Sequence, residues 1–369
     1  MHGERPNKSE RAEIVHNGIP DAVQQTQRVP SEPFIPSILF NVHRLKQGHP
    51  SAMTTETAAE TLRFASWNVN SLKVRLPQVL DWLEASRTDA VVLQETKLVD
   101  ELFPREAIEA AGYDVVFTGQ KTYNGVALLA RREKFALAET VLNLPGYPDE
   151  QKRFVAATLT PKTAAGAAAP IRFCGAYVPN GMAVGSGKYL YKLDWLAQLE
   201  RTMRAFLAET PNLILGGDFN IAPAARDLWD PVGWADGILC SGPEREAFAS
   251  LLGAGLADSF RLFEQPEGAY SWWDYRQQGF ERNHGLRIDC LLVSSALVPK
   301  VAAAAIDTAP RSNAQPSDHA PVTVDIALRR NVNADRENFS AREKASALAG
   351  LHRAHEASSP QKPGDCHIS

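Results

Sequence analysis

Short apolar runs that end in polar residues are the feature that most limits the folds open to this chain. Eight such runs are rich in Val, Ile, Leu and Phe and bounded by turn residues, as is typical of β-strands. They are RFASWNV, AVVLQET, GVALLAR, RFVAATL, IRFCGAYV, NLILGGDFNI, RIDCLLVS and PVTVDIAL. Apolar residues recur at helical spacing in residues 75–87 and again after GKYLYKLDW. The alternation predicts an α/β protein, and the Asn-Gly pair in TYNGVALLARRE predicts a tight hairpin and therefore some antiparallel pairing.

The two ends of the chain differ in composition from this body. Residues 1–60 are polar and rich in Pro, Ser, Glu and Gln, which predicts a disordered extension. Met53 precedes the first strand directly and is a candidate alternative translation start. Residues 61–329 form the predicted folded domain. Residues 330–369 are a polar tail with one short helix expected in SAREKASALAGLHRAHEA.

Composition narrows the class of protein. We find no apolar stretch long enough to span a membrane and no secretory signal pattern, so we expect a cytoplasmic protein without a membrane partner. The four cysteines, Cys174, Cys240, Cys290 and Cys366, lack metal-site spacing and are interpreted as reduced packing residues. The net charge of −4 argues against non-specific coating of nucleic acid but leaves room for a local basic surface.

Polar side chains stand at the ends of the predicted strands with unusual regularity. Strand ends of a layered α/β fold converge on one crevice, where ligands bind. A single Asp or Asn could equally cap a turn, but that reading explains the whole set poorly. The set comprises Asn68, Asn70, Glu95, Tyr177, Asn180, Asp218, Asn220, Asp289, Asp318 and His319.

The histidines and carboxylates indicate a type of chemistry. Seven of the nine histidines lie in the two tails, which leaves His284, interpreted as a surface residue, and His319, whose ring a carboxylate could orient. Carboxylates with one histidine and no cysteine suit a hard cation, Mg²⁺ or alternatively Mn²⁺, and such a cation favours phosphoryl chemistry. The chain lacks the P-loop, GxGxxG and GxSxG motifs of other common enzyme classes.

Seven motifs in order carry a resemblance to a known family. SWNVNSLK, LQETK, GAYVPNG, GGDFNIAP, SWWDYR, GLRIDCLLVS and SDHAPV, from about Arg63 to Leu328, closely resemble the exonuclease III family of AP endonucleases, within the endonuclease/exonuclease/phosphatase superfamily. The resemblance implies a four-layered α/β sandwich, with two mixed β-sheets packed face to face and helices outside. The long tails and the segment ARDLWDPVGWADGILCSG depart from the family pattern.

The resemblance also implies an activity. It is that of a Mg²⁺-dependent DNA-repair nuclease that incises 5′ to abasic sites and acts as a 3′–5′ exonuclease and 3′-phosphatase on duplex DNA. Such an enzyme would be a monomer of bacterial type, associated with the nucleoid through DNA and without a stable protein partner. Two alternatives stay open: a catalytically inactive regulator that binds nucleic acid, and a superfamily phosphodiesterase acting on RNA, a lipid or an inositol phosphate.

Residue roles follow from the resemblance. Asp218 would activate water that Asn220 holds, Asp289 would orient the imidazole of His319 on the phosphate, and Tyr177 would contact the scissile phosphate. Glu95 would be the principal metal ligand. The full set implied around the metal is Asn68, Glu95, Asp218, Asn220, Asp318 and His319.

Contacts with DNA are predicted partly from the resemblance and partly from the residues. The family's abasic-sugar pocket maps to Trp272, Trp273, Leu286 and Ile288, although adjacent tryptophans of a strand face opposite sides, so one can be core. The resemblance implies that Asn70 and Asn180 contact DNA, with Asn180 on a neighbouring phosphate. Basic and aromatic residues could also hold backbone phosphates, and a solvated helix face is the alternative for them. These are Lys188, Tyr189, Tyr191, Lys192, Arg276 and Arg287.

Overall fold

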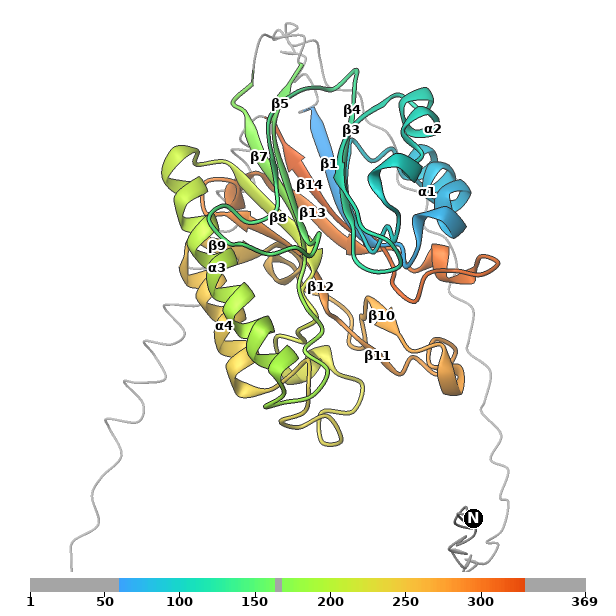
Figure 1. Ribbon diagram of the computed structural model, residues 1–369, viewed down its shortest axis with the longest axis vertical. Helices are drawn as coiled ribbons and strands as arrows, with labels where there is room; N and C mark the ends of the chain where they lie inside the picture. The colour runs from blue at the N-terminus through green and yellow to red at the C-terminus, as the bar shows by residue number, and fades with distance from the viewer. Residues whose placement is uncertain (1–59, 163–167, 329–369) are drawn as a thin grey trace, which may run out of the picture. The chain divides into compact units, whose positions relative to one another are not determined.

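Two six-stranded sheets pack face to face in the computed structural model, which describes residues 60–162 and 168–328 (Figure 1). The first sheet has the order β13-β14-β1-β2-β4-β3 and the second the order β5-β6-β7-β8-β12-β9. Each is mixed, because β1 and β2 pair in parallel in one and β7 and β8 in the other, while the remaining pairs are antiparallel. The strands of the first sheet are β1 (Thr61–Asn68), β2 (Ala90–Gln94), β3 (Tyr113–Thr118), β4 (Val126–Arg131), β13 (Val301–Ile306) and β14 (Val322–Ala327). Those of the second are β5 (Phe135–Leu142), β6 (Phe154–Pro161), β7 (Ile171–Tyr177), β8 (Leu213–Asp218), β9 (Leu256–Asp258) and β12 (Asp289–Ser294).

Helices cover the outer face of each sheet and complete four layers. The first sheet is covered by α1 (Leu72–Ser86) and α2 (Arg105–Ala110), and the second by α3 (Gly187–Glu209) and α4 (Gly242–Gly253) (Figure 1). The described residues also include short 3-10 helices at Asp100–Leu102, Ala225–Asp227, Ser259–Leu262, Arg276–Gln278, Val298–Lys300 and Ala309–Ser312. The predicted four-layered α/β sandwich is confirmed.

Two glycines let the sheets approach closely. Gly175 of β7 and Gly216 of β8 are partners in register, and both face Val92 of the opposite sheet. A Cβ atom at Gly175 would lie 2.8 Å from Val92 Cβ, and one at Gly216 would lie 3.0 Å from Val92 Cγ2. Contacts this short would force the sheets apart, so the absence of side chains here sets the spacing of the sandwich.

A third, small sheet connects the loops at one end of the sandwich. It consists of β10 (Trp272–Trp273) and β11 (Gly285–Leu286), paired antiparallel. Isolated bridges extend it on both sides, from Trp272 to His319 and from Leu286 to Leu228. Four segments that are far apart in sequence are thereby held side by side.

All eight predicted strand runs are strands, namely β1, β2, β4, β6, β7, β8, β12 and β14. Of the strands in the two large sheets, the prediction missed β3, β5, β9 and β13. β13 is a run of alanines between two apolar residues that carries no period-two pattern. The Asn-Gly pair precedes β4 of an antiparallel pair as expected, but residues 119–125 connect the strands, so the hairpin is not tight. Met53, the C-terminal helix, Cys366 and the predicted tails, Glu60 apart, lie outside the described residues.

Burial agrees with the reading of the three described cysteines as packing residues. Cys174, Cys240 and Cys290 are buried free thiols, and burial raises the pKa of the Cys174 thiol to about 12. Such thiols are packing groups rather than nucleophiles. No helix in the described part of the chain is long and apolar enough to cross a membrane.

Candidate active site

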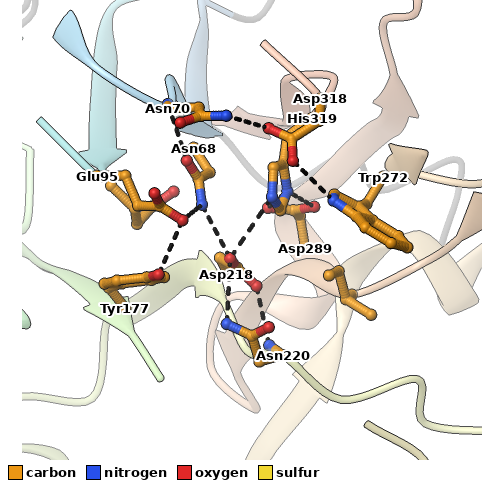
Figure 2. Close-up of polar contacts among 12 residues, drawn as sticks. Asn68, Asn70, Glu95, Tyr177, Asp218, Asn220, Trp272, Asp289, Asp318 and His319 are labelled. Carbon is orange, nitrogen blue, oxygen red and sulfur yellow. Dashed lines mark hydrogen bonds and ion pairs between the residues drawn. The ribbon is translucent and has the colours of Figure 1, made fainter. Parts of the chain in front are cut away.

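The site lies at one end of the layer between the two sheets. Tyr177, Asp218 and Asp289 are direct partners in register on β7, β8 and β12, so the three side chains share one face of the second sheet. The first sheet contributes Asn68, the last residue of β1, and Glu95, which follows β2 (Figure 2). The two halves of the site therefore belong to different sheets.

A buried histidine is held between two carboxylates. His319 Nδ1 lies 2.9 and 3.1 Å from the two oxygens of Asp289, and its Nε2 lies 3.7 Å from Asp218 Oδ2. Ser271 fixes Asp289 in turn, because its hydroxyl donates to Asp289 Oδ2 at 2.7 Å. Burial alone would lower the pKa of His319, but the two carboxylates outweigh it and raise that pKa to about 10. The ring is an oriented imidazolium at neutral pH, with Nε2–H directed toward Asp218.

Asp218 is an almost fully enclosed carboxylate, with 1% of its surface exposed. Its Oδ1 accepts from the backbone N–H of Asn220 at 2.9 Å, and its Oδ2 accepts from Asn68 Nδ2 at 2.9 Å and Asn220 Nδ2 at 3.3 Å. Burial raises the pKa of Asp218 to about 7, although His319 counteracts part of the effect. A carboxylate with such a pKa can accept a proton from water near neutral pH.

A second polar cluster surrounds Glu95. Its Oε1 accepts from Tyr177 OH at 2.8 Å and from Asn68 Nδ2 at 2.9 Å, and its Oε2 pairs with Lys97 Nζ at 2.8 Å (Figure 2). Burial would raise the pKa of Glu95, but Lys97 and the Asn68 amide outweigh it and lower the pKa. Burial and the Glu95 carboxylate raise the pKa of Tyr177 well above its ordinary value, so the phenol stays a neutral donor. Here Asn68 bridges two carboxylates through its amide N–H₂, which differs from its predicted part as a metal ligand.

Asp318 closes the rim of the site. Asn70 Nδ2 donates to its Oδ1 at 2.9 Å, and Trp272 Nε1 donates to its Oδ2 at 3.0 Å. Lys97 Nζ also donates to Asn70 Oδ1 at 2.6 Å, which links this carboxylate to Glu95. Asp318 and Glu95 therefore face one polar space from opposite sides.

The donor set fits a hard divalent cation. Ligand atoms of Asp218, Asp289 and His319 lie within 4.8 Å of one another, and Glu95 and Asp318 add carboxylate oxygens beside them. These ligands are oxygens with one imidazole and no thiolate, as Mg²⁺ or Mn²⁺ prefers. Asp289 is held against the His319 ring, so the carboxylates that could hold a cation are those of Glu95, Asp318 and Asp218. Each of these also accepts hydrogen bonds from neighbouring groups.

Several predicted backbone contacts with DNA are wrong. Lys192 of α3 is fully buried and pairs with Glu244, and Tyr189 of the same helix is also buried. Arg287 is buried with its guanidinium on Asp227 and Asp258, so it holds loops together. The cause is common to all three, because each side chain points into the packing layer rather than to solvent.

Other predicted contacts are placed where DNA could reach them. Lys188 is exposed at the start of α3, and Asn180 is exposed beside the site, where its Nδ2 donates to Asn220 Oδ1 at 3.1 Å. Asn70 is half-buried at the rim. Arg276 is exposed, but its guanidinium pairs with Asp274 of the same loop, which neutralises part of its charge. Tyr191 is half-buried and donates its hydroxyl to Asp149 at 2.6 Å.

The predicted apolar pocket is closed. Of its four predicted lining residues only Trp272 has appreciable exposed surface, while Trp273, Leu286 and Ile288 are 2%, 0% and 2% exposed. Trp273 faces the opposite side of β10, as adjacent strand residues must, and donates to Asn283 Oδ1 at 3.0 Å. Leu286 and Ile288 are covered by a cluster that includes Trp272 and residues of the loop after Asp218. This covering loop, whose pattern departs from the family, is the reason for the difference.

Sequence reasoning missed two residues of the site. Ser271 holds Asp289, and Lys97 holds both Glu95 and Asn70. Each stands next to or inside a recognised motif, Lys97 at the end of LQETK and Ser271 at the start of SWWDYR. His284, expected on the surface, is half-buried, and its ring stacks on Trp229 with centroids 3.8 Å apart.

Comparison with known proteins gives consistent matches. The sequence pattern of the Endonuclease/Exonuclease/phosphatase family matches residues 65–319. Exodeoxyribonuclease III of Haemophilus influenzae is 34% identical over 273 residues, which cover 71% of this chain and 98% of that protein. A Neisseria 3′ phosphatase variant, solved with a product DNA hairpin, is 41% identical with a TM-score of 0.67, covering 72% of this chain and 99% of the other. An AP endonuclease from Archaeoglobus fulgidus is 31% identical with a TM-score of 0.65, covering 73% and 100%.

Proposed function

The chain belongs to the Endonuclease/Exonuclease/phosphatase family, and from this membership we propose that it is a Mg²⁺-dependent DNA-repair nuclease. Its substrate is duplex DNA with abasic sites or damaged 3′ ends. It hydrolyses the phosphodiester 5′ to an abasic site, and it acts as a 3′–5′ exonuclease and 3′-phosphatase. The relatives named exodeoxyribonuclease III, 3′ phosphatase and AP endonuclease support this range of activities.

The observation that carries the proposal is the pairing of Asp218 with the His319–Asp289 couple. The pKa of Asp218, raised to about 7 by burial, suits it to accept a proton from the attacking water. Hydrogen bonds from Asn220 and Asn68 hold the Asp218 carboxylate in one orientation. His319, kept protonated by Asp289, directs Nε2–H to a phosphate oxygen and stabilises the charge that develops there.

Tyr177 is the second donor to the phosphate. Its hydroxyl now donates to Glu95 at 2.8 Å, and the guanidinium of Arg153 lies 4.7 Å from the centre of its ring. Because the phenol remains neutral, it can turn this hydrogen bond from Glu95 to a phosphate oxygen. Asn180, exposed beside Asn220, is suited to hold the neighbouring phosphate.

The cation belongs between the acidic residues of the two sheets. Glu95, Asp318 and Asp218 would hold it, with Asn70 and Lys97 fixing the first two. A bound Mg²⁺ would neutralise phosphate oxygens and the leaving oxyanion. Lys97 occupies one oxygen of Glu95, so it keeps that carboxylate ionised and ready for a cation.

Burial of Leu286 and Ile288 bears on the balance of activities. A flipped abasic sugar would have to enter the apolar cluster of Leu286 and Ile288, on which Trp272 packs, whereas Asp218 and His319 lie outside that cluster. The closed cluster therefore favours 3′-end processing as the faster reaction. Incision at abasic sites is expected to be slower.

The test uses three labelled duplexes of one sequence. One contains a single tetrahydrofuran abasic analogue, one has a recessed 3′-hydroxyl end, and one has a recessed 3′-phosphate end. Each is incubated with Mg²⁺, with Mn²⁺ and with excess EDTA, and the Asp218→Asn variant purified in parallel controls for contaminating nucleases. Cutting that requires both the metal and Asp218 supports the proposal, and the initial rates rank the three activities.

Other results would point elsewhere. Tight binding of the duplexes without cutting would replace the nuclease by a regulator that binds nucleic acid. Neither binding nor cutting would direct the search to phosphate esters outside DNA. Metal-independent cutting that survives in Asp218→Asn would remove the assigned chemistry altogether.

A further inference from the structure

A fully buried ammonium lies beneath the catalytic loop. Lys192 of α3 has 0% of its surface exposed. Its Nζ donates to the backbone carbonyl of Asn220 at 2.6 Å, to that of Asn180 at 3.2 Å, and to Glu244 Oε1 at 2.5 Å. A lysine ammonium has three N–H donors, and these three acceptors satisfy all of them. The side chain therefore has one arrangement that leaves no donor unpaired.

The partner carboxylate is fixed as firmly as the ammonium. Glu244 Oε1 accepts from Leu239 N at 3.1 Å, and Oε2 accepts from Ser241 N at 3.0 Å and Ser241 Oγ at 2.7 Å. This is the reciprocal pattern of a helix start, since Ser241 is the cap residue of α4. Tyr189 of α3 adds its hydroxyl 2.8 Å from Ser241 Oγ. Lys192 thus links its own helix, α3, to the start of α4 through Glu244.

The two carbonyls that Lys192 holds belong to Asn220 and Asn180, two of the amide residues of the site. Asn220 has a φ of 49°, in the left-handed region, where surrounding contacts are needed to hold a residue other than glycine. In this conformation its N–H and Nδ2 both point to Asp218, and its Oδ1 accepts from Asn180 Nδ2. A turn of the Asn220 peptide would take both donors away from Asp218.

We propose that Lys192 is a positioning residue of the nuclease site, which fixes the backbones of Asn220 and Asn180 so that both amides face the reacting phosphate. The inference rests on the proposed function for its effect on catalysis. A buried ion pair is weak evidence for stability, because apolar side chains of similar size often replace such pairs without loss. An apolar side chain cannot, however, donate to two carbonyls, and that is the part that the ammonium plays here.

The experiment separates positioning from folding by removing first one charge and then both. Lys192→Met leaves Glu244 charged and buried without its partner, so it should lower both the melting temperature and activity. Lys192→Met/Glu244→Gln removes both charges and should recover most of the melting temperature. Met203→Ala is the control, because Met203 is buried in the same helix but has no donor for the carbonyls of Asn220 and Asn180.

The kinetic readout is the 3′-end assay described above. We expect the double variant to keep KM while kcat stays about 10- to 100-fold below the wild type, as for a lost orientation of catalytic groups. Met203→Ala, measured below its melting temperature, should keep its kcat. Wild-type kcat in the double variant would show that the pair is only structural and would overturn the inference.

A second readout does not depend on activity. In ¹⁵N-labelled protein the side-chain amide of Asn220 should give one sharp, shifted pair of resonances that is lost or broadened in the double variant and unchanged in Met203→Ala. Unchanged Asn220 resonances in the double variant would refute positioning even if wild-type protein does not cut DNA. If the wild-type protein is inactive but these resonances behave as expected, the proposed function fails while the positioning stands.

Discussion

Asp218→Asn should make the protein more stable and far less active. Burial raises the pKa of Asp218 from 3.8 to about 7, so ionising this carboxylate is harder in the folded than in the unfolded chain. A group with a raised folded-state pKa contributes stability that is complete below the unfolded pKa and lost as pH rises through the folded one. About three pKa units correspond to about 4 kcal/mol lost above neutral pH.

Asparagine resembles the protonated acid, so it avoids this loss. It has one acceptor oxygen instead of two, and one hydrogen bond from Asn68 or Asn220 would be lost at about 1–2 kcal/mol. We therefore expect a net gain of about 2 kcal/mol near pH 8, which shrinks as pH falls from about 7 to about 4. Loss of the proton acceptor should reduce the rate by about 10²- to 10⁴-fold.

Urea unfolding with EDTA, carried out near pH 5 and near pH 8, measures the gap in unfolding free energy. Rates on the 3′-end duplex and binding by fluorescence anisotropy complete the comparison, and binding should survive. A variant that is less stable than the wild type near pH 8, or a gap that does not depend on pH, would refute the reasoning.

Three further changes test other parts of the site. Asp289→Asn should bring the pKa of His319 down from about 10 toward or below 6.5, as read from its imidazole resonances. The folded wild type keeps a proton that the unfolded chain releases, so the wild-type stability should fall as pH rises from 6.5 to about 10. A variant whose stability falls with the same slope would contradict this. Trp272→Ala releases Asp318 and uncovers Leu286, so it should raise the rate of incision at the abasic analogue relative to 3′-end processing. An unchanged ratio of the two rates would count against closure of the pocket by Trp272. Lys188→Ala should reduce the slope of log Kd against log salt concentration by about 0.9 with kcat unchanged, and an unaltered slope would exclude a phosphate contact.

The convergence of polar residues could be predicted because strand pattern fixes it. A strand end is marked in the sequence by the change from apolar to polar residues, as after LILGG at Asp218. Once the strands are known, the crevice follows from the architecture. Tyr177, Asp218 and Asp289 meet in register, as such an arrangement requires.

The burial of Lys192 could also be predicted from its spacing along the helix, but its charge suggested that it was exposed. Lys192 shares a helix face with Leu196, Leu199 and Met203, at spacings of four, three and four residues. That spacing places it in the packing layer, whereas its charge suggested solvent. Its partner Glu244 lies 52 residues away, and local pattern carries no information on so distant a pairing.

Closure of the apolar pocket could not be predicted. It depends on how the loop between Asp218 and α4 folds over Leu286 and Ile288. That loop has no periodicity, and its sequence departs from the family pattern. Contacts set by loop conformation lie beyond what strand and helix periods determine.

The division of the site between two sheets makes the thickness of the sandwich a control on catalysis. Asn68 donates to Glu95 at the end of its own sheet and to Asp218 of the opposite sheet, so both hydrogen bonds form only at one distance between the sheets. A side chain at Gly216 would lie 3.0 Å from Val92 Cγ2 of the opposite sheet and would push the two sheets apart at that point. A mutagenesis screen for inactive yet folded protein should therefore return such interior glycines alongside the acidic residues.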